Sequence, residues 1–352
     1  MPQPWGIMQQ NRRSFLARAA LSAAGAEYGS RAYASQAAFD GRDNKRHDQG
    51  LERIILESFV NLPDRKAVKI WAPEVEDASE FLVQLNADQQ MFVASTMKAI
   101  ILCQRLRQLD SPEVESNIKN HEVPLDREVW SPGSDIFNPP DLSGLVSERT
   151  AMEAMVIHSD NTATDMVLKQ AGADAVREFI SSIGLTKSMI PDSTRAFGAY
   201  LAGAPNYKAI TFDELLALPV GPLAHPFLND VQTFASSPDD LVSFFSRALQ
   251  GEFFLNRETL FEFRRILLLG DISYLVPFPL GLSVFGKAGY ADIPGAHARS
   301  IAGAVYFPNR WIHFSMILNW DAKEAEDPET VNAFYSAIHK SISLLQRHLR
   351  SS

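Results

Sequence analysis

The chain has 352 residues, of which 46% are apolar and 21% charged, and its formal net charge is −9. This composition is typical of a globular protein, and the acidic charge argues against nucleic-acid binding, which requires a basic patch. The single cysteine, Cys103, excludes an intrachain disulfide, and no apolar run reaches the roughly 18 residues of a membrane-spanning helix.

The first 34 residues have the features of an export signal. The pair Arg12 and Arg13 precedes a mildly apolar stretch, 15–26, and the small-x-small pattern a signal peptidase reads ends at Ala34. Paired arginines in this setting are typical of twin-arginine export signals. We therefore expect residues 1–34 to be removed and the mature protein to be periplasmic or secreted. It has no cysteine near the new N-terminus to carry a lipid, so we expect no stable membrane anchor.

The mature chain, 35–352, shows one order of elements: a helix, two strands, a long helical middle, three strands and a last helix. Apolar residues at helical spacing predict helices over 50–61 and after Pro328. Strand patterns fall at 67–71, 81–85, 282–287, 300–307 and 311–319. The strands of the two ends (about 50–90 and 280–350) can form one sheet. We therefore predict an α+β fold, a five-stranded antiparallel sheet flanked by helices with a mostly helical second region over about 91–279.

Within the helical middle, the clearest helix is predicted over 173–183, with Gly184 at its end. Another is predicted to begin at Thr150, whose hydroxyl can cap the helix while Glu153 reaches back, as in a capping box. The stretch 191–230 lacks strong periodicity, which is often the mark of a functional loop.

The first chemical motif is Ser95-Thr96-Met97-Lys98, followed by an apolar helical stretch. If Ser95 begins that helix, Lys98 lies one turn on and on the same face. Burial disfavours the ammonium form of a lysine, so Lys98 can act as a base for the Ser95 hydroxyl. We expect Lys98 Nζ to lie within hydrogen-bond reach of Ser95 Oγ.

Two further motifs follow in order. Ser159-Asp160-Asn161 stands between two predicted helices and offers a hydroxyl for proton transfer and an amide for a substrate. Lys287-Ala288-Gly289 ends a predicted strand, where an extended amide substrate could pair edgewise beside the lysine cation.

These three motifs resemble S-x-x-K, S-D-N and K-T-G of class A β-lactamases and penicillin-binding proteins. The resemblance implies that Ser95 is the nucleophile and that Lys98 and Ser159 move protons. It implies an oxyanion hole made by the backbone N–H groups of Ser95 and Tyr290. The residues expected to bind the substrate are Asn161, Lys287, Gly289, Tyr290 and Arg299, the last as a candidate for holding a carboxylate.

The sequence departs from the family pattern twice. Ala288 stands where the family usually has a hydroxyl residue, so carboxylate recognition would rest on Lys287, Arg299 or Ser159. In addition, no Glu-x-x-Leu-Asn motif lies between Leu185 and Ser237 to supply the base that hydrolyses the acyl-enzyme. Asp192 and Glu214 are the nearest candidates for that base, although solvated or capping roles are more common for such residues.

The resemblance favours a serine hydrolase that opens the β-lactam amide of antibiotics. Two alternatives stay open. One is a slowly deacylating penicillin-binding protein, D-Ala-D-Ala carboxypeptidase or esterase, and the other is a non-enzymatic protein that binds peptidoglycan-like ligands. In each case the partner is a small molecule. No metal spacing is present among the eight histidines, so we expect no metal or cofactor, and we expect a monomer.

Overall fold

The computed structural model describes residues 41–63, 65–76, 79–219, 221–307 and 310–351. The predicted export signal, residues 1–34, lies outside the described residues. In the part of the chain that is described, no helix has both the length and the apolar character needed to cross a bilayer.

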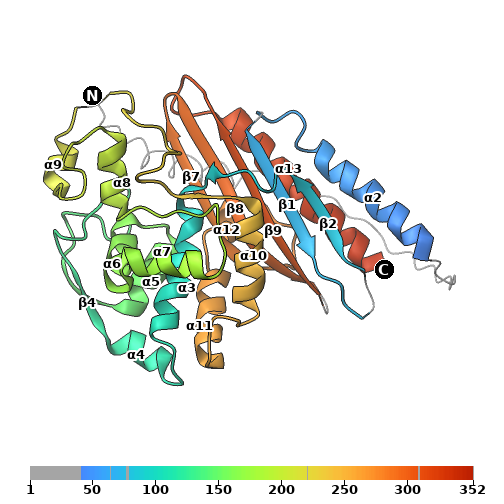
Figure 1. Ribbon diagram of the computed structural model, residues 1–352, viewed down its shortest axis with the longest axis horizontal. Coiled ribbons are helices and arrows are strands. Elements are labelled where there is room, and N and C mark those ends of the chain that lie inside the picture. Colours follow the sequence, from blue (N-terminus) through green and yellow to red (C-terminus); the bar gives the residue numbers. More distant parts are fainter. Residues whose placement is uncertain (1–40, 64, 77–78, 220, 308–309, 352) are drawn as a thin grey trace.

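A five-stranded antiparallel sheet forms the centre of the molecule, in the order β2-β1-β9-β8-β7 (Figure 1). Its strands are β1 (Lys66–Ala72), β2 (Phe81–Leu85), β7 (Ser283–Ile293), β8 (Ala296–Phe307) and β9 (Arg310–Trp320). The predicted fold class is therefore confirmed.

One predicted strand end is wrong. Strand β7 continues past Lys287 because its backbone pairs with β8 from Gly289 opposite Ser300 to Ile293 opposite Ala296. Backbone pairing needs no apolar side chain, so the polar and small residues here concealed the strand. The third motif therefore lies inside a strand rather than at its end.

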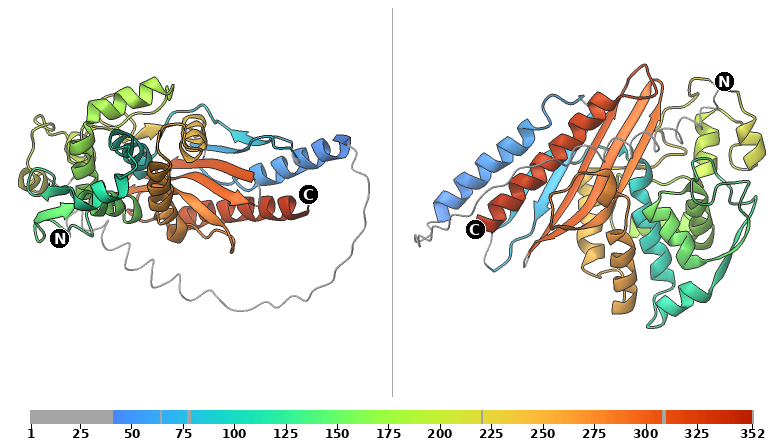
Figure 2. Two further views of the ribbon diagram at one scale, coloured as in Figure 1. Left: turned by 90° about the horizontal axis from the view of Figure 1, so that it is seen from below. Right: turned by 180° about the vertical axis from the view of Figure 1, so that it is seen from behind.

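Each face of the sheet is covered by a different set of helices. On β9, Ile312, Phe314 and Met316 alternate with residues of the opposite face, as strand geometry requires, and join a core shared with α2 (Gly41–Glu57) and α13 (Pro328–Ser351). Figure 2 shows α2 and α13 side by side on that face, with the helical region on the other. Apolar burial on both faces makes the sheet a rigid support for the residues that project toward the helical region.

The helical region contains ten α-helices among the described residues, together with two short ribbons. The helices are α3 (Lys98–Gln108), α4 (Val114–Asn120), α5 (Glu148–Ile157), α6 (Asn161–Ala171), α7 (Ala173–Ser182), α8 (Thr194–Leu201), α9 (Phe212–Leu216), α10 (Pro238–Leu249), α11 (Arg257–Leu268) and α12 (Ile272–Leu275). The ribbons pair β3 (Met91–Phe92) with β6 (Ala235–Ser236) and β4 (Glu122–Leu125) with β5 (Gly144–Ser147). The sequence pattern did not predict the ribbons, because strands this short carry no periodicity.

The predicted capping box at Thr150 is wrong by one turn. Helix α5 begins at Glu148, and Ser147 is its N-cap, because the Ser147 hydroxyl accepts a hydrogen bond from the Thr150 backbone N–H at 3.1 Å. Glu153 instead forms ion pairs with Arg149 and Arg265.

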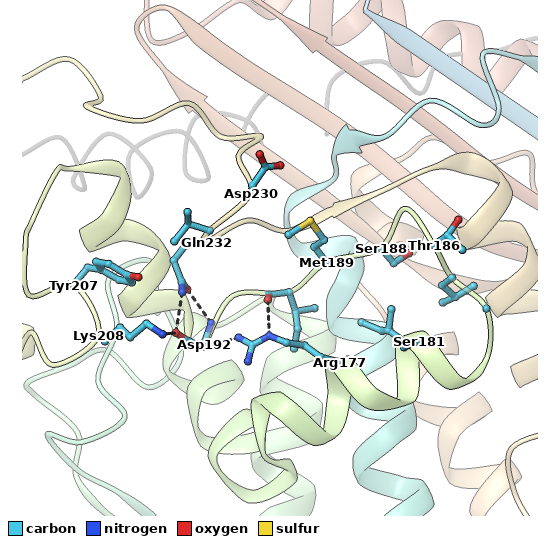
Figure 3. A pocket seen from close by; sticks show the side chains of 15 residues that line it. Arg177, Ser181, Thr186, Ser188, Met189, Asp192, Tyr207, Lys208, Asp230 and Gln232 are labelled. Carbon is cyan, nitrogen blue, oxygen red and sulfur yellow. Dashed lines mark hydrogen bonds and ion pairs between the residues drawn. The ribbon is translucent and has the colours of Figure 1, made fainter.

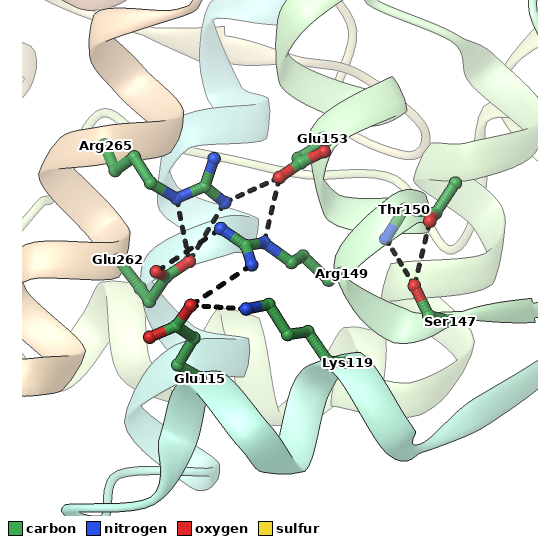
Figure 4. A network of polar contacts seen from close by, with 8 residues as sticks. All are labelled: Glu115, Lys119, Ser147, Arg149, Thr150, Glu153, Glu262 and Arg265. Carbon is green, nitrogen blue, oxygen red and sulfur yellow. Dashed lines mark hydrogen bonds and ion pairs between the residues drawn. The ribbon is translucent and has the colours of Figure 1, made fainter.

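A network of ion pairs joins α5 to α11. Arg149 of α5 and Arg265 of α11 both contact Glu153, at 3.0 and 2.6 Å, and the buried Glu262 accepts from Arg265 at 2.9 Å (Figure 4). Because several charges are shared across two helices, this network has a defined geometry that isolated surface pairs lack. It fixes the direction of α11, whose C-terminal end leads into the turn that carries Asp271.

The sheet face toward the helical region buries one unusual polar side chain, His313 of β9. Its ring stacks on Trp71 at 5.6 Å between centroids, and neither ring nitrogen has a hydrogen-bond partner among the described residues. Burial lowers the pKa of His313 to about 4. The ring is therefore neutral in the folded protein at neutral pH.

We predict that His313 makes the protein acid-sensitive. An unfolded histidine titrates near 6.5, so below that pH the unfolded chain binds the proton more readily and stability falls until the folded ring titrates near 4. The loss amounts to about 2 kcal/mol or more at pH 4.5. His313→Phe keeps the stacking and removes the titration, so the free energy of unfolding should fall less between pH 7 and 4.5 in the variant. Identical pH dependence of wild type and variant in urea unfolding would contradict the assignment.

Candidate active site

Ser95 lies in a turn that is otherwise closed to solvent. The short 3₁₀ helix η1 (Ala94–Met97) leads directly into α3, and Ser95 is its partly exposed residue, while the rest of η1 is buried. Ala94 has a φ of +47°, which costs free energy for a residue with a Cβ and persists only where the surroundings hold it. Such local strain is typical of a nucleophile presented at a sharp turn.

The surroundings that hold the turn belong to the sheet. Thr96 Oγ1 donates to Ser300 Oγ at 2.6 Å, and Ser300 Oγ donates to the Val93 carbonyl at 2.6 Å. Gly289 of β7 lies directly beneath, where a Cβ would stand 2.3 Å from the Val93 oxygen and 2.9 Å from the Thr96 nitrogen. Only a glycine allows this approach, so Gly289 sets the distance between η1 and β7. The backbones of Ser95 and Tyr290, the expected oxyanion hole, thereby lie on neighbouring elements.

Lys98 is buried, at 1% exposure, in the first turn of α3. Its Nζ donates to the Ser159 carbonyl at 2.6 Å, to Asn161 Oδ1 at 2.8 Å and to Ser159 Oγ at 3.5 Å. Burial first, and the nearby Lys287 cation second, lower the pKa of Lys98 to about 7. At neutral pH a large share of Lys98 is therefore an uncharged amine, the form that can accept a proton.

The expected hydrogen bond between Lys98 Nζ and Ser95 Oγ is not formed in the described residues, because Nζ is directed to Ser159 and Asn161. Hydrogen bonds that act in catalysis are often long before the substrate is bound. Ser95 in η1 and Lys98 at the start of α3 are still separated by a single helical turn, as the motif predicts.

The second motif is held at the N-terminus of α6. Asp160 caps the helix by accepting from the Ala163 N–H at 2.8 Å, and its other oxygen accepts from the N–H groups of Ile136 and Phe137 at 3.0 Å. Ser159, with a φ of +57°, turns its side chain toward Lys98 and Lys287. Asp160 is thus a structural carboxylate that fixes the position of Ser159.

Asn161 bridges the second motif and the neighbouring loop. Its Oδ1 accepts from Lys98, and its Nδ2 donates to the Pro132 carbonyl at 2.8 Å. A Cβ at Gly133 would lie 2.7 Å from that Nδ2, so the loop approaches Asn161 closely only because residue 133 is glycine.

Lys287 is fully buried on β7 and contacts a residue that sequence reasoning missed. Its Nζ donates to Ser159 Oγ at 3.1 Å, to the Ala288 carbonyl at 2.8 Å and to a carboxylate oxygen of Asp271. The other Asp271 oxygen accepts from the Ala288 N–H at 3.0 Å. Asp271 therefore neutralises Lys287 and holds the strand beside it. A carboxylate after the apolar run of α11 was the one sequence signal that could have indicated it.

Two glycines make this contact possible. Asp271 lies in the turn between α11 and α12, next to Gly270, whose hypothetical Cβ would stand 2.6 Å from the Gly286 carbonyl oxygen. Gly286 in turn lies against Ala302 and Gly303 of β8. The turn can thus press onto the sheet, and the short Asp271 side chain reaches Lys287.

The structure brings together Ser159 with Lys98, Asn161 and Lys287, and it places Gly289 against the turn that carries Ser95. It does not bring Arg299 to this group. Arg299 lies opposite Tyr290, on the sheet face away from Lys287, because neighbouring β7 residues alternate between faces.

The Arg299 guanidinium forms a bidentate pair with Asp292, at 2.8 and 2.7 Å, and stacks over the rings of Tyr290 and Trp320. Such a pair is strong and geometrically fixed. Arg299 thus serves the packing beneath α13 in this structure, and any role toward a substrate carboxylate would require breaking it.

Asp192, the first candidate for the deacylating base, is engaged elsewhere. It accepts from Arg177 at 2.5 Å and from Gln232 at 2.8 Å and lies 3.3 Å from Lys208, on the wall of a cavity of about 560 Å³ (Figure 3). Partial burial alone would raise the pKa of Asp192, but the hydrogen bonds from Arg177 and Gln232 hold it below its ordinary value. No residue of the three motifs lines this cavity.

Glu214, the second candidate, is an exposed capping residue. Its carboxylate accepts from the backbone N–H and the hydroxyl of Thr211, while the Thr211 hydroxyl accepts from the Glu214 N–H. These hydrogen bonds lower the pKa of Glu214. A capping box is therefore formed here, at the start of α9.

Hydroxyl groups occupy the part of the loop that does meet the site. Thr194 Oγ1 lies 3.2 Å from the Asn161 carbonyl, 2.8 Å from Ser131 Oγ and 2.7 Å from the buried carboxylate of Asp165. Burial raises the pKa of Asp165 to about 6, and its oxygens also accept from the N–H groups of Thr194 and Arg195. Asp165 thus anchors the loop, with its oxygens already occupied by three donors.

Within the described residues, no group of three or more His, Cys, Asp or Glu side chains is arranged to hold a metal ion.

We predict that Gly289→Ala displaces the nucleophile. The added methyl group would clash with Val93 and Thr96 and shift Ser95 by a fraction of an ångström to an ångström, and misplacements of this size can cost about 10²-fold in rate. Labelling of Ser95 by a fluorophosphonate should slow accordingly. Gly221→Ala is the matched control, because Gly221 is exposed and has no atom within 4 Å of the new methyl group. Equal labelling of the two variants would overturn the role given to Gly289.

Known structures share this fold. A crystal structure of the TLA-3 extended-spectrum β-lactamase is 17% identical, covers 86% of this chain and 99% of its own, and has a TM-score of 0.64. A class A β-lactamase from Bacteroides cellulosilyticus is 16% identical, with 85% and 98% coverage and a TM-score of 0.64. PBP-A is 18% identical, with 85% and 97% coverage and a TM-score of 0.62. At these identities the likeness establishes the fold.

No curated protein matches the sequence significantly. The model of the β-lactamase enzyme family, however, matches residues 51–341, which include all three motifs, both sheet halves and the helical region. The resemblance noted from the motifs is thereby confirmed, and the chain belongs to the β-lactamase enzyme family.

Proposed function

We propose that the protein is a serine hydrolase that forms an acyl-enzyme at Ser95 with β-lactams or related amides and esters, and that hydrolyses this intermediate slowly. The observation that carries the proposal is the contrast between the two half-reactions. Groups suited to acylation converge on Ser159, whereas both carboxylates considered for deacylation are bound to other partners.

Acylation begins with Lys98. In its neutral form the amine takes the proton of Ser95 Oγ, and the oxygen attacks the carbonyl carbon of the substrate. Because the pKa of Lys98 is lowered to about 7, the neutral amine is available at neutral pH. An amine with this pKa is still basic enough to accept the proton. In this proposal the backbone N–H groups of Ser95 and Tyr290 stabilise the negative charge that develops on the carbonyl oxygen.

Collapse of the tetrahedral intermediate requires a proton on the leaving nitrogen or oxygen. The Ser159 hydroxyl lies between Lys98, at 3.5 Å, and Lys287, at 3.1 Å. It can pass the proton gained by Lys98 to the leaving group as the carbonyl–heteroatom bond breaks. Ser95 then carries the acyl group as an ester.

Hydrolysis of that ester needs a base for the attacking water. Near Asn161 lie the hydroxyls of Thr194 and Ser131, which are not bases at neutral pH, and the carboxylate of Asp165 on α6, whose oxygens are engaged. A solved structure of a protein with this fold, a PBP-A mutant, shows such an intermediate as an acyl-enzyme complex with penicillin G. Without a positioned base the intermediate should persist, which favours a penicillin-binding activity over rapid β-lactam turnover.

We also propose that the mature protein acts outside the cytoplasm as a monomer, where β-lactams and peptidoglycan-like amides are found. The support for export is the twin-arginine pattern at Arg12 and Arg13. If export uses this signal, the wild-type protein should leave the cytoplasm and the double variant Arg12→Lys, Arg13→Lys should remain there. Retention of the wild type, or equal export of the double variant, would contradict the export proposal.

We predict that penicillin G leaves a lasting adduct on Ser95. General-base assistance is worth about 10²–10⁴-fold, so its absence should make deacylation the slow step and give a burst of acylation before slow turnover. Time-resolved mass spectrometry of the intact protein measures both phases. Ser95→Ala should abolish the adduct, and Lys98→Ala should nearly abolish it. When residues act as a unit, removing one of them costs nearly as much in rate as removing them all.

Each other outcome of this experiment has a definite meaning. Rapid steady turnover without a burst would show that a base has been overlooked and that the protein is a β-lactamase. If neither penicillin G nor an activated ester labels Ser95, the protein is not an acylating enzyme and the non-enzymatic alternative holds.

A further inference from the structure

Lys287 and Asp271 form an ion pair that is completely buried, with both side chains at 0% exposure. Removing two charges from water is costly, and such a pair is weak evidence of a contribution to stability. The geometry instead relates the pair to Ser159. Lys287 Nζ has one proton for Asp271, one for the Ala288 carbonyl and one for Ser159 Oγ.

Asp271 determines where these protons point. Its two oxygens are used differently, one for Lys287 Nζ and one for the Ala288 N–H, so the carboxylate is clamped between a side chain and the backbone of the same strand. The turn that carries it is pressed onto β7 by the contact between Gly270 and Gly286. Lys287 can therefore not rotate away from Ser159 without losing its counter-charge.

The consequence for Ser159 concerns its hydroxyl proton. When Lys287 donates to Ser159 Oγ, one lone pair of that oxygen is occupied and the hydroxyl proton must point elsewhere. One remaining direction leads toward Lys98, at 3.5 Å, and the other is left for the leaving group of the proposed reaction.

We propose that Asp271 is a positioning residue for protonation of the leaving group, acting through Lys287 on the Ser159 hydroxyl. This inference rests on the proposed function. In the step concerned, the bond from the carbonyl carbon to the leaving oxygen or nitrogen breaks, and that atom takes its proton from Ser159 Oγ. Ser159 is reprotonated by the Lys98 ammonium, which holds the proton taken from Ser95, so no other reactant is needed.

The test compares two esters of phenylacetic acid, the p-nitrophenyl ester and the methyl ester. Both produce the same phenylacetyl group on Ser95, so deacylation is identical and only acylation differs. Nitrophenolate departs without a proton, whereas methoxide requires one. Asp271→Asn keeps the shape and one acceptor oxygen, removes the charge and replaces the other oxygen by an NH2 donor, so Lys287 Nζ and the Ala288 N–H can no longer both be accepted. It should slow acylation by the methyl ester about tenfold or more. Acylation by the p-nitrophenyl ester should change by less than about threefold, since it makes no use of the proton-transfer step.

Asp292→Asn is the matched control. Asp292 also forms an ion pair with a cation of the same sheet, Arg299, but on the opposite face and with the two side chains 13% and 11% exposed. Its loss should lower stability in thermal unfolding without changing the ratio of the two acylation rates. A purely structural Asp271 would behave as Asp292 does.

The same substitution in a Lys287→Met background tests the route through Lys287. In this background Asp271→Asn leaves no buried lysine without a counter-charge. If Asp271 acts only through Lys287, Asp271→Asn should leave the ratio of rates unchanged in a Lys287→Met background. A further change in the ratio there overturns the proposed route. Equal losses with both esters in the single variant, or no loss with either, overturn the proposal as a whole.

The two levels of inference fail in different ways. If neither penicillin G nor the p-nitrophenyl ester labels Ser95 of the wild-type protein, the proposed function fails and the role of Asp271 fails with it. If the label forms but Asp271→Asn shows no selectivity for the leaving group, the proposed function stands and only this inference is lost.

Discussion

The structure depends on the way two buried lysines share one small site. Lys98 and Lys287 approach the same Ser159 hydroxyl from different elements, and each is essentially inaccessible to water. Two adjacent cations in a region of low dielectric repel each other strongly. The site is stable because Asp271 compensates Lys287, while burial and that same repulsion favour the neutral form of Lys98. The arrangement thus separates the charge states of two chemically identical side chains, since Lys287 stays a cation while Lys98 is partly a neutral amine.

The fold supplies the rigidity that this separation requires. The nucleophile turn is joined to β8 through Ser300 and rests on β7 at Gly289, so its position follows the sheet. The turn after α11 is pressed onto the same strand at Gly286, and the ion-pair network with α5 fixes the helix that leads to it. Both faces of the sheet are packed with apolar side chains, which explains how contacts from distant parts of the chain can be maintained within a few tenths of an ångström.

Much of this could be predicted from the sequence, and the omissions have physical causes. The five strands and the three motifs are local patterns, and the order of the motifs predicts their convergence once the family is recognised. Asp271 could not be found in this way, because its partner is set by a contact between two glycine backbones that no periodicity records. Arg299 was expected at the site because of its position after the third motif, but strand alternation turns it to the opposite face, where Asp292 binds it. Asp192 and Glu214 were chosen for their charge and place in the loop, whereas their hydrogen-bond partners decide their roles.

We propose that Lys98 is the base that activates Ser95 and that its surroundings keep it partly neutral at physiological pH. An NMR titration of the protein with isotopically labelled lysine side chains measures this protonation state, with Lys98→Met identifying the resonance. We expect one lysine signal that titrates near pH 7, because burial and Lys287 lower the pKa of Lys98 to about 7. A Lys98 signal that titrates near the ordinary lysine value of about 10.4 would contradict it, because an ammonium group could not accept the Ser95 proton.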